Sequence, residues 1–112
     1  TALVIWLQMQ EGDDVAAARR AVTLCHDPRA SHFYDSGRLS GRAVAAALGA
    51  RPGSIAWDAY LVYRPGVRWE AIPPAPLEWV HQLRGSRWAD PARYRTGDAL
   101  VAALRAAVAA VA

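Results

Sequence analysis

The sequence contains a single cysteine, and this scarcity limits its chemistry more than any other feature of the composition. One cysteine excludes an intrachain disulfide, an all-cysteine zinc site and the two-cysteine redox motif CxxC. Lysine and asparagine are absent altogether, so all 13 basic residues are arginine. Together with the abundant alanine, this pattern is typical of a GC-rich genome. The net charge of +3 and the pI of 9.6 are therefore weak evidence for a nucleic-acid partner.

Long apolar segments are also absent. The apolar run at residues 2–7 is far shorter than the roughly 20 residues that cross a bilayer, and it lacks the basic flank and cleavage site of a signal peptide. A charged fraction of 21% and a mean hydropathy of +0.02 are typical of a globular domain. A length of 112 residues fits one core. We therefore expect residues 1–112 to form a single domain with no membrane partner.

Motifs that mark well-known catalytic and nucleotide sites are missing as well. The chain has no phosphate loop, no Rossmann glycine pattern, no GxSxG and no HExxH. The acidic residues Asp35, Asp58 and Glu70 are too scattered in sequence to predict a catalytic carboxylate pair. We therefore expect neither a metal nor a cofactor.

The first half of the chain alternates strand and helix patterns. Residues 2–9 form a short apolar run, which predicts a strand buried on both faces. Residues 14–25 repeat apolar side chains every three or four positions, which predicts a helix. Residues 32–34 are a short strand candidate. A second helix is expected over residues 39–48, with Gly49 at its end.

The second half begins with the strongest strand pattern. Residues 57–63 are rich in aromatic and β-branched side chains. The turn at residues 64–67 has proline second and glycine third, as a type II turn requires, so we expect a hairpin over residues 57–71. Residues 77–83 predict two helical turns, and residues 96–111 carry the apolar stripe of a closing helix.

These elements predict an α/β fold with a mixed sheet. Their order, with Asp35 and Gly37 before an alanine-rich helix, Gly49 after it and Gly66 in the hairpin turn, resembles the thioredoxin-like superfamily. The resemblance is closest to the later part of TlpA-type and peroxiredoxin-like domains, and it covers residues 2–72 plus the final helix. It implies a thioredoxin-like mixed sheet with flanking helices.

The redox motif of that superfamily is missing, which shapes what the resemblance implies about function. Cys25 stands alone at the predicted end of a helix, whereas reactive thiols favour helix N-termini. Either residues 2–9 are the central strand and residues 11–14 replace the motif, or the first strand–helix unit, with CxxC, lies upstream of Thr1. The resemblance implies a redox-inactive binding or scaffold domain, or the distal part of a larger thiol-redox protein. The alternative is a thiol or peroxide oxidoreductase whose cysteine motif lies upstream or on a partner.

Aromatic residues in and around the predicted hairpin indicate a contact surface. This region resembles bacterial thioredoxin-like proteins with no assigned chemistry. Aromatic side chains on both faces of a two-stranded ribbon indicate that one face meets helices. The other face meets either the proline- and arginine-rich arm of residues 73–95 or a partner, such as another protein or a second copy of the chain. The residues expected at this surface are Trp57, Tyr60, Trp69 and Trp79.

Arginines and aromatic residues alternate within the arm. Such a pattern is used for phosphate pairing and base stacking in single-stranded nucleic-acid binding, or for clamping an anionic small ligand. The genomic bias toward arginine and the nearby Asp90 and Asp98 disfavour a nucleic-acid partner, and a solvated loop is the simpler interpretation. The residues concerned are Arg84, Arg87, Arg93 and Arg95, with Trp88 and Tyr94 between them.

Cys25 and the three histidines are the remaining candidates for chemistry. Cys25, His26 and His32 supply ligand atoms that zinc accepts, with His81 as a fourth, but their spacing matches no standard zinc motif. A small apolar cysteine beside surface histidines is the simpler interpretation. His81 has the chemistry of a general base near neutral pH, and the alternative is a hydrogen bond to a loop carbonyl.

Overall fold

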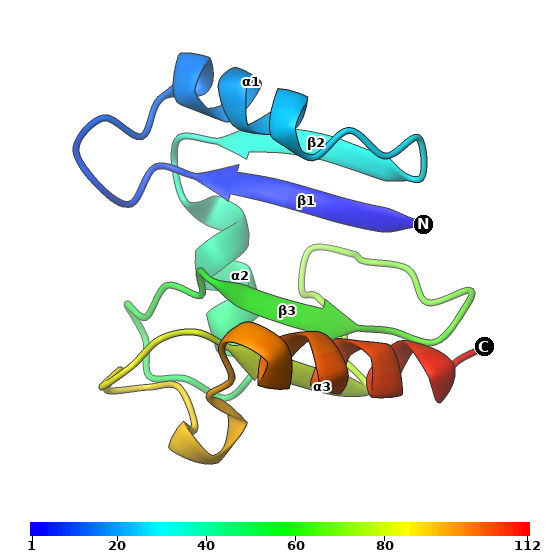
Figure 1. Ribbon diagram of the computed structural model, residues 1–112. Coiled ribbons are helices and arrows are strands. Elements are labelled where there is room, and N and C mark those ends of the chain that lie inside the picture. Colours follow the sequence, from blue (N-terminus) through cyan, green and yellow to red (C-terminus); the bar gives the residue numbers. More distant parts are fainter. The chain divides into compact units, whose positions relative to one another are not determined.

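The computed structural model describes residues 1–112 as a mixture of helices and strands (Figure 1). The elements are β1 (Ala2–Leu7), α1 (Val15–Leu24), β2 (Ala30–Asp35), α2 (Leu39–Ala47), β3 (Ala59–Val62), β4 (Glu78–His81), the 3₁₀ turn η1 (Pro91–Arg93) and α3 (Gly97–Ala109). The predicted α/β class is therefore confirmed. The chain forms two compact units, residues 1–41 and residues 42–112, which are described in turn.

The first unit is built on a pair of parallel strands. β1 and β2 pair in register from Ala2 opposite Ala30 to Leu7 opposite Asp35. Parallel neighbours need a long crossover, and here α1 provides it and lies against β2 (Figure 1). The carboxylate of Asp14 caps α1 by accepting a hydrogen bond of 2.7 Å from the backbone N–H of Ala17. The helix expected over residues 14–25 is thus confirmed to within one residue at each end.

One face of this two-stranded sheet is open, so the expectation that the first strand is buried on both faces is wrong. Leu3 is 63% exposed and Phe33 is 55% exposed, and both lie on the same face. On the other face, the rings of Trp6 and His32 stack, and the indole N–H donates to Nδ1 of His32 over 3.2 Å. A parallel sheet is buried on both faces only where helices cover both, and α1 is the one complete helix in this unit.

The second unit is organised around an antiparallel pair of strands. β3 pairs with β4, so that Tyr60 lies opposite Val80. On one face of this pair, Leu61 packs against a buried cluster of Val44, Ala45 and Ala56. The closing helix α3 lies against the same two strands (Figure 1). The core of the unit therefore forms where α2 meets the sheet.

The strand that pairs with β3 is not the one expected. The hairpin over residues 57–71 is wrong, and so is the helix over residues 77–83, because β4 occupies this position as a strand. The type II turn itself is present: Val67 N–H donates to the carbonyl of Arg64 over 3.3 Å, and Gly66 has φ +83°.

The physical reason for the different pairing is burial. Residues 67–71 are all exposed, whereas Val80 and His81 in β4 are buried. The chain returns to β3 after the proline segment, where the hydroxyl of Tyr63 donates to the carbonyl of Pro74 over 3.2 Å. A helix of only two turns would be marginally stable in water. Residues 78–81 are more stable as a strand that pairs with β3.

The closing helix agrees with its sequence pattern. α3 covers most of the expected residues 96–111, with Thr96 at its N-cap and Leu100 buried. The helix has the length of an ordinary soluble helix rather than of a membrane span. Indeed, none of the helices is both long enough and apolar enough to cross a membrane.

Asp35 links the end of β2 to the beginning of α2. Its carboxylate accepts hydrogen bonds from the backbone N–H of Ser40 over 2.8 Å and from the Ser40 hydroxyl over 2.5 Å. Partial burial raises the pKa of Asp35. The hydrogen bonds from Ser40, and from the backbone of Leu39 and Gly37, lower it by more, so the pKa lies below its ordinary value of 3.8.

This shift predicts a pH-dependent contribution of Asp35 to stability. A lowered pKa means that the ionised carboxylate stabilises the fold above the ordinary value, and this stabilisation is lost as the pH falls through the folded-state pKa. We expect Asp35→Asn to lower the free energy of unfolding by about 1 kcal/mol near neutral pH, a cost typical of a lost helix-start hydrogen bond. Urea unfolding from about pH 7 to about pH 3 should show this cost shrinking.

The control is Glu11→Gln, which removes an exposed acid at another loop position. Its effect on the unfolding free energy should stay small at both ends of the pH range. A cost of Asp35→Asn that is the same in acid as at neutral pH would contradict the assignment.

Candidate binding site

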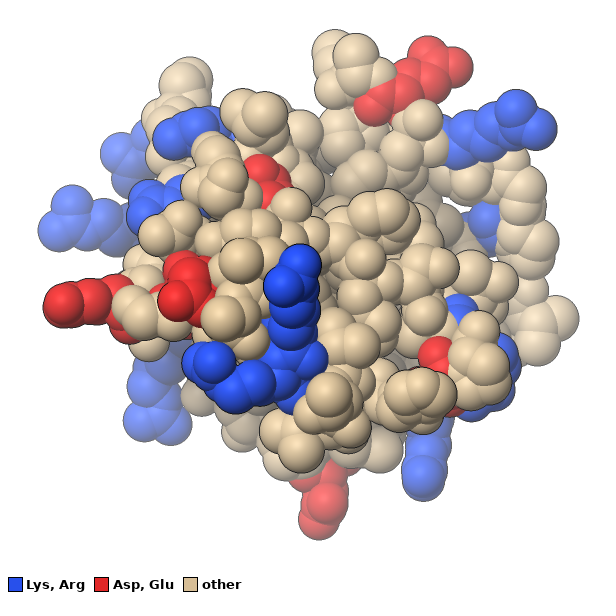
Figure 2. Space-filling view, turned by 90° about the horizontal axis from the view of Figure 1, so that it is seen from above, with Lys and Arg blue, Asp and Glu red and all other residues tan.

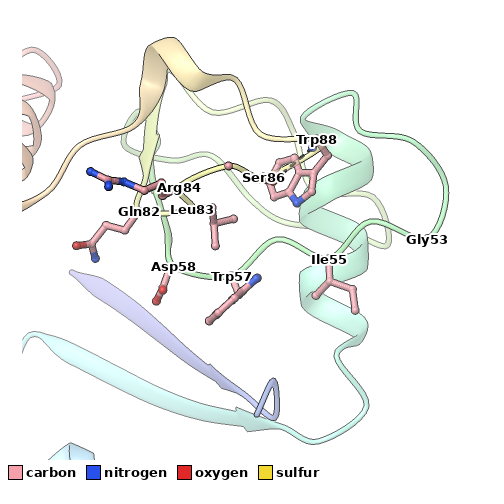
Figure 3. Close-up of a pocket in the computed structure, with 10 residues that line it drawn as sticks. Gly53, Ile55, Trp57, Asp58, Gln82, Leu83, Arg84, Ser86 and Trp88 are labelled. Carbon is pink, nitrogen blue, oxygen red and sulfur yellow. Dashed lines mark hydrogen bonds between the residues drawn. The ribbon is translucent and has the colours of Figure 1, made fainter.

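An open pocket of about 490 Å³ lies in the second unit (Figure 3). Its wall comes from two chain segments, residues 53–58 before β3 and residues 82–88 after β4. Apart from the glycines, Ile55 and Leu83, the side chains that line it are those of Trp57, Asp58, Gln82, Arg84, Ser86 and Trp88. The pocket thus combines two indole rings with an acid, a base, an amide and a hydroxyl.

Strand pairing brings the two segments together. Because β3 and β4 are antiparallel, the beginning of one lies beside the end of the other. The pairing continues one residue further, where the backbone N–H of Gln82 donates to the carbonyl of Asp58 over 2.9 Å. The side-chain nitrogen of Gln82 donates to the hydroxyl of Tyr60 over 2.8 Å. The pocket therefore depends on β4 being a strand.

Asp58 has an uncommon backbone conformation for a residue with a side chain. Its φ is +44°, a left-handed value that aspartate tolerates better than most residues. Its exposed carboxylate forms no hydrogen bond or ion pair within the chain. Burial raises the pKa of Tyr60, and the negative charge of Asp58 raises it further, against the opposing effect of the Gln82 hydrogen bond.

The loop after β4 forms the other wall. Gly85 has φ +68°, and the N–H of Ser86 donates to the carbonyl of Leu83 over 3.4 Å. The hydroxyl of Ser86 accepts hydrogen bonds from the backbone N–H groups of Trp88 and Ala89, over 3.3 and 3.2 Å. These bonds hold the loop in a tight turn and place Trp88 beside the pocket.

Trp88 is anchored from behind. Its ring stacks on that of Trp79, with centroids 6.2 Å apart and an interplanar angle of 9°. It also packs against the buried cluster around Val44 and Ala45. Arg84, by contrast, is exposed and lies over the ring of Tyr94 at 5.8 Å. One side of the pocket is therefore rigidly packed, and its charged rim is open to solvent.

The four arginines of the arm separate into two pairs. Arg93 forms an ion pair with Glu78, donates to the carbonyl of Trp79 over 2.9 Å and lies 5.0 Å from the Trp79 ring centre. The pKa of Glu78 is lowered by a hydrogen bond from the Trp79 backbone N–H and by Arg93. Arg95 donates to backbone carbonyls. Arg84 and Arg87 are exposed and have no acidic partner.

The four expected aromatic contact residues do not form one surface. Trp57 lines the pocket. Tyr60 lies opposite Val80 and Trp79 lies opposite Leu61, so the side chains of Tyr60 and Trp79 are on opposite faces of the strand pair. Trp69 lies in the loop before β4, where its ring packs edge-on against Tyr63 at 5.9 Å. Of these residues, Trp57 is the one that the structure places with Arg84.

Cys25 and the histidines are not brought together as a metal site. Cys25 is exposed at the C-cap of α1, and its N–H donates to the carbonyl of Val22 over 3.1 Å. His26 is exposed, and His32 is engaged by Trp6. Within residues 1–112, no group of three or more histidine, cysteine, aspartate or glutamate side chains is arranged to hold a metal ion.

His81 is the one fully buried polar residue, with 0% exposure. Its Nδ1 accepts a hydrogen bond from the N–H of Leu83 over 3.0 Å, so Nε2 carries the proton and donates to the carbonyl of Asp90 over 2.7 Å. The sequence left two roles open for His81, a general base or a hydrogen bond to a loop carbonyl, and the structure shows the hydrogen bond. Both ring nitrogens are hydrogen-bonded to backbone groups, and the ring is not exposed to solvent.

The sequence does not mark Asp58, Gln82 or Ser86 as site residues. Asp58 lies in the predicted strand of residues 57–63 and Gln82 in the helix expected over residues 77–83, and the only local signal at Ser86 is the glycine beside it. Comparison of the chain with protein-family models, with curated proteins and with solved structures finds no match. The site is therefore interpreted from its own geometry.

The hydrogen bonds of His81 predict a structural role that can be measured. We expect His81→Ala to lower the free energy of unfolding by about 3 kcal/mol, because it leaves a cavity in place of a buried ring and removes the partners of the Leu83 N–H and the Asp90 carbonyl. Denaturant unfolding followed by far-UV circular dichroism measures this change. The matched control His26→Ala removes an exposed imidazole and should cost less than about 0.5 kcal/mol. Equal effects of the two substitutions would contradict the role assigned to His81.

Proposed function

We propose that this chain is a thioredoxin-like domain without a redox centre of its own, and that it serves as a binding domain whose binding site is the pocket at Trp57. The order of elements supports the first part. A parallel strand pair joined by a helix precedes an antiparallel pair and a closing helix. The resemblance has the same succession, although it expected the strand that pairs with β3 at residues 67–71 and the structure has β4 instead. β1 pairs with β2 and β3 pairs with β4, and the two pairs form separate two-stranded sheets.

The position of Cys25 supports a role other than thiol chemistry. Nucleophilic thiolates are typically found at helix N-termini, beside cations or in paired-cysteine motifs. Cys25 instead lies at the C-terminal end of α1, where the helix dipole is negative. It is also the sole cysteine. Cys25 therefore lies at the opposite helix end from the one that activates a thiol, and it has no second cysteine to pair with.

The observation that carries the binding role is the unpaired chemistry of the pocket. Tryptophan and arginine are the residues most enriched where binding energy concentrates, and both line this pocket. Asp58 and Arg84 have no ionic partner within the chain. Polar groups that are not used to hold the fold, set beside apolar rings, are the usual composition of a binding site.

The redox part of this proposal predicts the outcome of an insulin-reduction assay with dithiothreitol. We expect the chain to give the rate of the protein-free blank, because a single cysteine cannot cycle between a dithiol and a disulfide within one chain. Cys25→Ser should give the same rate. Turnover above the blank that disappears in Cys25→Ser would instead favour the oxidoreductase alternative.

The binding part predicts which substitutions abolish capture of a ligand or partner. The immobilised chain is exposed to a cell extract, and bound molecules are identified by mass spectrometry. We expect Trp57→Ala to reduce capture about tenfold, the effect of losing one central aromatic anchor. Asp58→Asn tests the same site without changing the backbone preference.

The control for this experiment is Leu24→Ala, which removes an apolar side chain that is 90% exposed on α1. Capture that is unchanged by Leu24→Ala and lost in both pocket variants supports the proposal. Capture that falls equally in all three variants, or in none, would refute it.

A further inference from the structure

The loop between β4 and Trp88 carries an unusual concentration of free hydrogen-bond donors. Arg84, Gly85 and Ser86 line the pocket, and Arg87 is the next residue along the loop. Neither arginine has an acidic partner. The backbone N–H groups of Gly85 and Arg87 have no acceptor within the chain. Since the Ser86 oxygen already accepts two hydrogen bonds, its own proton is free to donate.

Such a set of donors is suited to an anion. Guanidinium groups pair with phosphate oxygens through two parallel hydrogen bonds. The free N–H groups of Gly85 and Arg87 add donors on either side of the Ser86 N–H, which is bound to the carbonyl of Leu83. Arg93 and Arg95 offer no comparable site, because acidic or carbonyl oxygens already occupy them. The donors of the loop are therefore suited to one compact anion, such as a phosphate group.

The rest of the pocket is suited to a planar ring with an amino group. Trp57 and Trp88 line it with indole surfaces, and Figure 3 shows them on separate chain segments, Trp57 before β3 and Trp88 on the loop after β4. Two acceptors lie on the same lining: the free carboxylate of Asp58, and the side-chain oxygen of Gln82, whose nitrogen is already bound to Tyr60. An aromatic surface beside acceptors recognises a base through stacking and through its exocyclic amino group.

We propose that the pocket binds a nucleoside monophosphate unit, with the phosphate on the loop of residues 84–87 and the base against the tryptophans, its amino group donating to Asp58. This inference rests on the proposed binding function and names the class of ligand. A volume of about 490 Å³ lies within the range of small-molecule sites.

The distribution of charge favours a free nucleotide over a nucleic-acid strand. A strand needs a row of cations that follows successive phosphates. The loop of residues 84–87 instead holds just two cations, Arg84 and Arg87, both free of acidic partners. The face of the molecule in Figure 2 likewise shows arginines interspersed with acidic side chains. The site therefore matches one phosphate rather than many.

The first test is quenching of tryptophan fluorescence in the full chain. The probes are CMP, cytidine, inorganic phosphate and a single-stranded deoxycytidine oligonucleotide. We expect CMP to quench the fluorescence in a saturable manner, and cytidine to bind at least about tenfold more weakly, because it lacks the charge that the arginines pair with. Arg84→Ala with Arg87→Ala should weaken CMP binding by a similar factor.

The matched control is Arg19→Ala with Arg20→Ala, which removes the same charge from exposed positions on α1. CMP affinity in this variant should stay within about twofold of the unmodified chain, as expected for a distant surface change. If both double variants weaken binding equally, the effect is one of general charge and the proposed site is wrong.

The second test concerns Asp58 and the amino group of the base. CMP carries an amino group where UMP carries a carbonyl oxygen, so the carboxylate should favour CMP by about fivefold or more. Asp58→Asn should bring the two affinities to within about twofold of each other while UMP binding is kept. A preference that is unchanged in Asp58→Asn would overturn the placement of the base.

Two further outcomes would overturn the inference itself. One is the absence of quenching by CMP, AMP and GMP up to about 10 mM, weaker than ordinary ligand affinities. The other is oligonucleotide binding more than about a hundredfold tighter than CMP with a steep salt dependence, which indicates a strand-binding surface. Neither outcome affects the proposed binding function, which fails instead if Cys25-dependent reduction is observed or if capture does not depend on Trp57.

Discussion

The buried imidazole of His81 is the constraint on which the second unit depends. It ties the end of β4 to two later parts of the chain, through Leu83 on one ring nitrogen and Asp90 on the other. The carbonyl of the same residue accepts a hydrogen bond of 2.9 Å from the N–H of Arg95. An apolar side chain here would leave the N–H of Leu83 and the carbonyl of Asp90 without these partners. One polar side chain thereby fixes the loop between Leu83 and Asp90, and with it one wall of the pocket.

The arginines near this loop fall into two groups, those that hold the fold together and those that have no acidic partner. Where an arginine lies close to a strand carboxylate, as Arg93 does to Glu78, the ionic interaction holds the 3₁₀ turn against β4. Exposed ion pairs contribute little to stability, so their value here is in positioning. Arg84 and Arg87 lie on a loop that His81 already holds in place, and they are not needed for that purpose. Their charge is therefore available to a ligand.

The sequence predicted those parts of the fold whose pattern is local. α1 and α3 have their own apolar periodicity, and Asp14 is a conventional N-cap, so both helices were identified. β4 was not, because residues 78–81 are too few to distinguish a strand from a helix by periodicity. What decides their state is pairing with β3, a non-local interaction. The pocket could not be predicted either, because Gln82 and Ser86 reach it only when β4 is a strand. The left-handed backbone of Asp58 also has no signature in the sequence.

The separation of cysteine and pocket follows from how the two units are built. Every residue that lines the pocket belongs to residues 42–112, whereas Cys25 belongs to residues 1–41. The geometry of the pocket is held by β3, β4 and the His81 hydrogen bonds, none of which involves the cysteine. The pocket and the cysteine therefore belong to different units, and the substitutions that alter one leave the hydrogen bonds of the other in place.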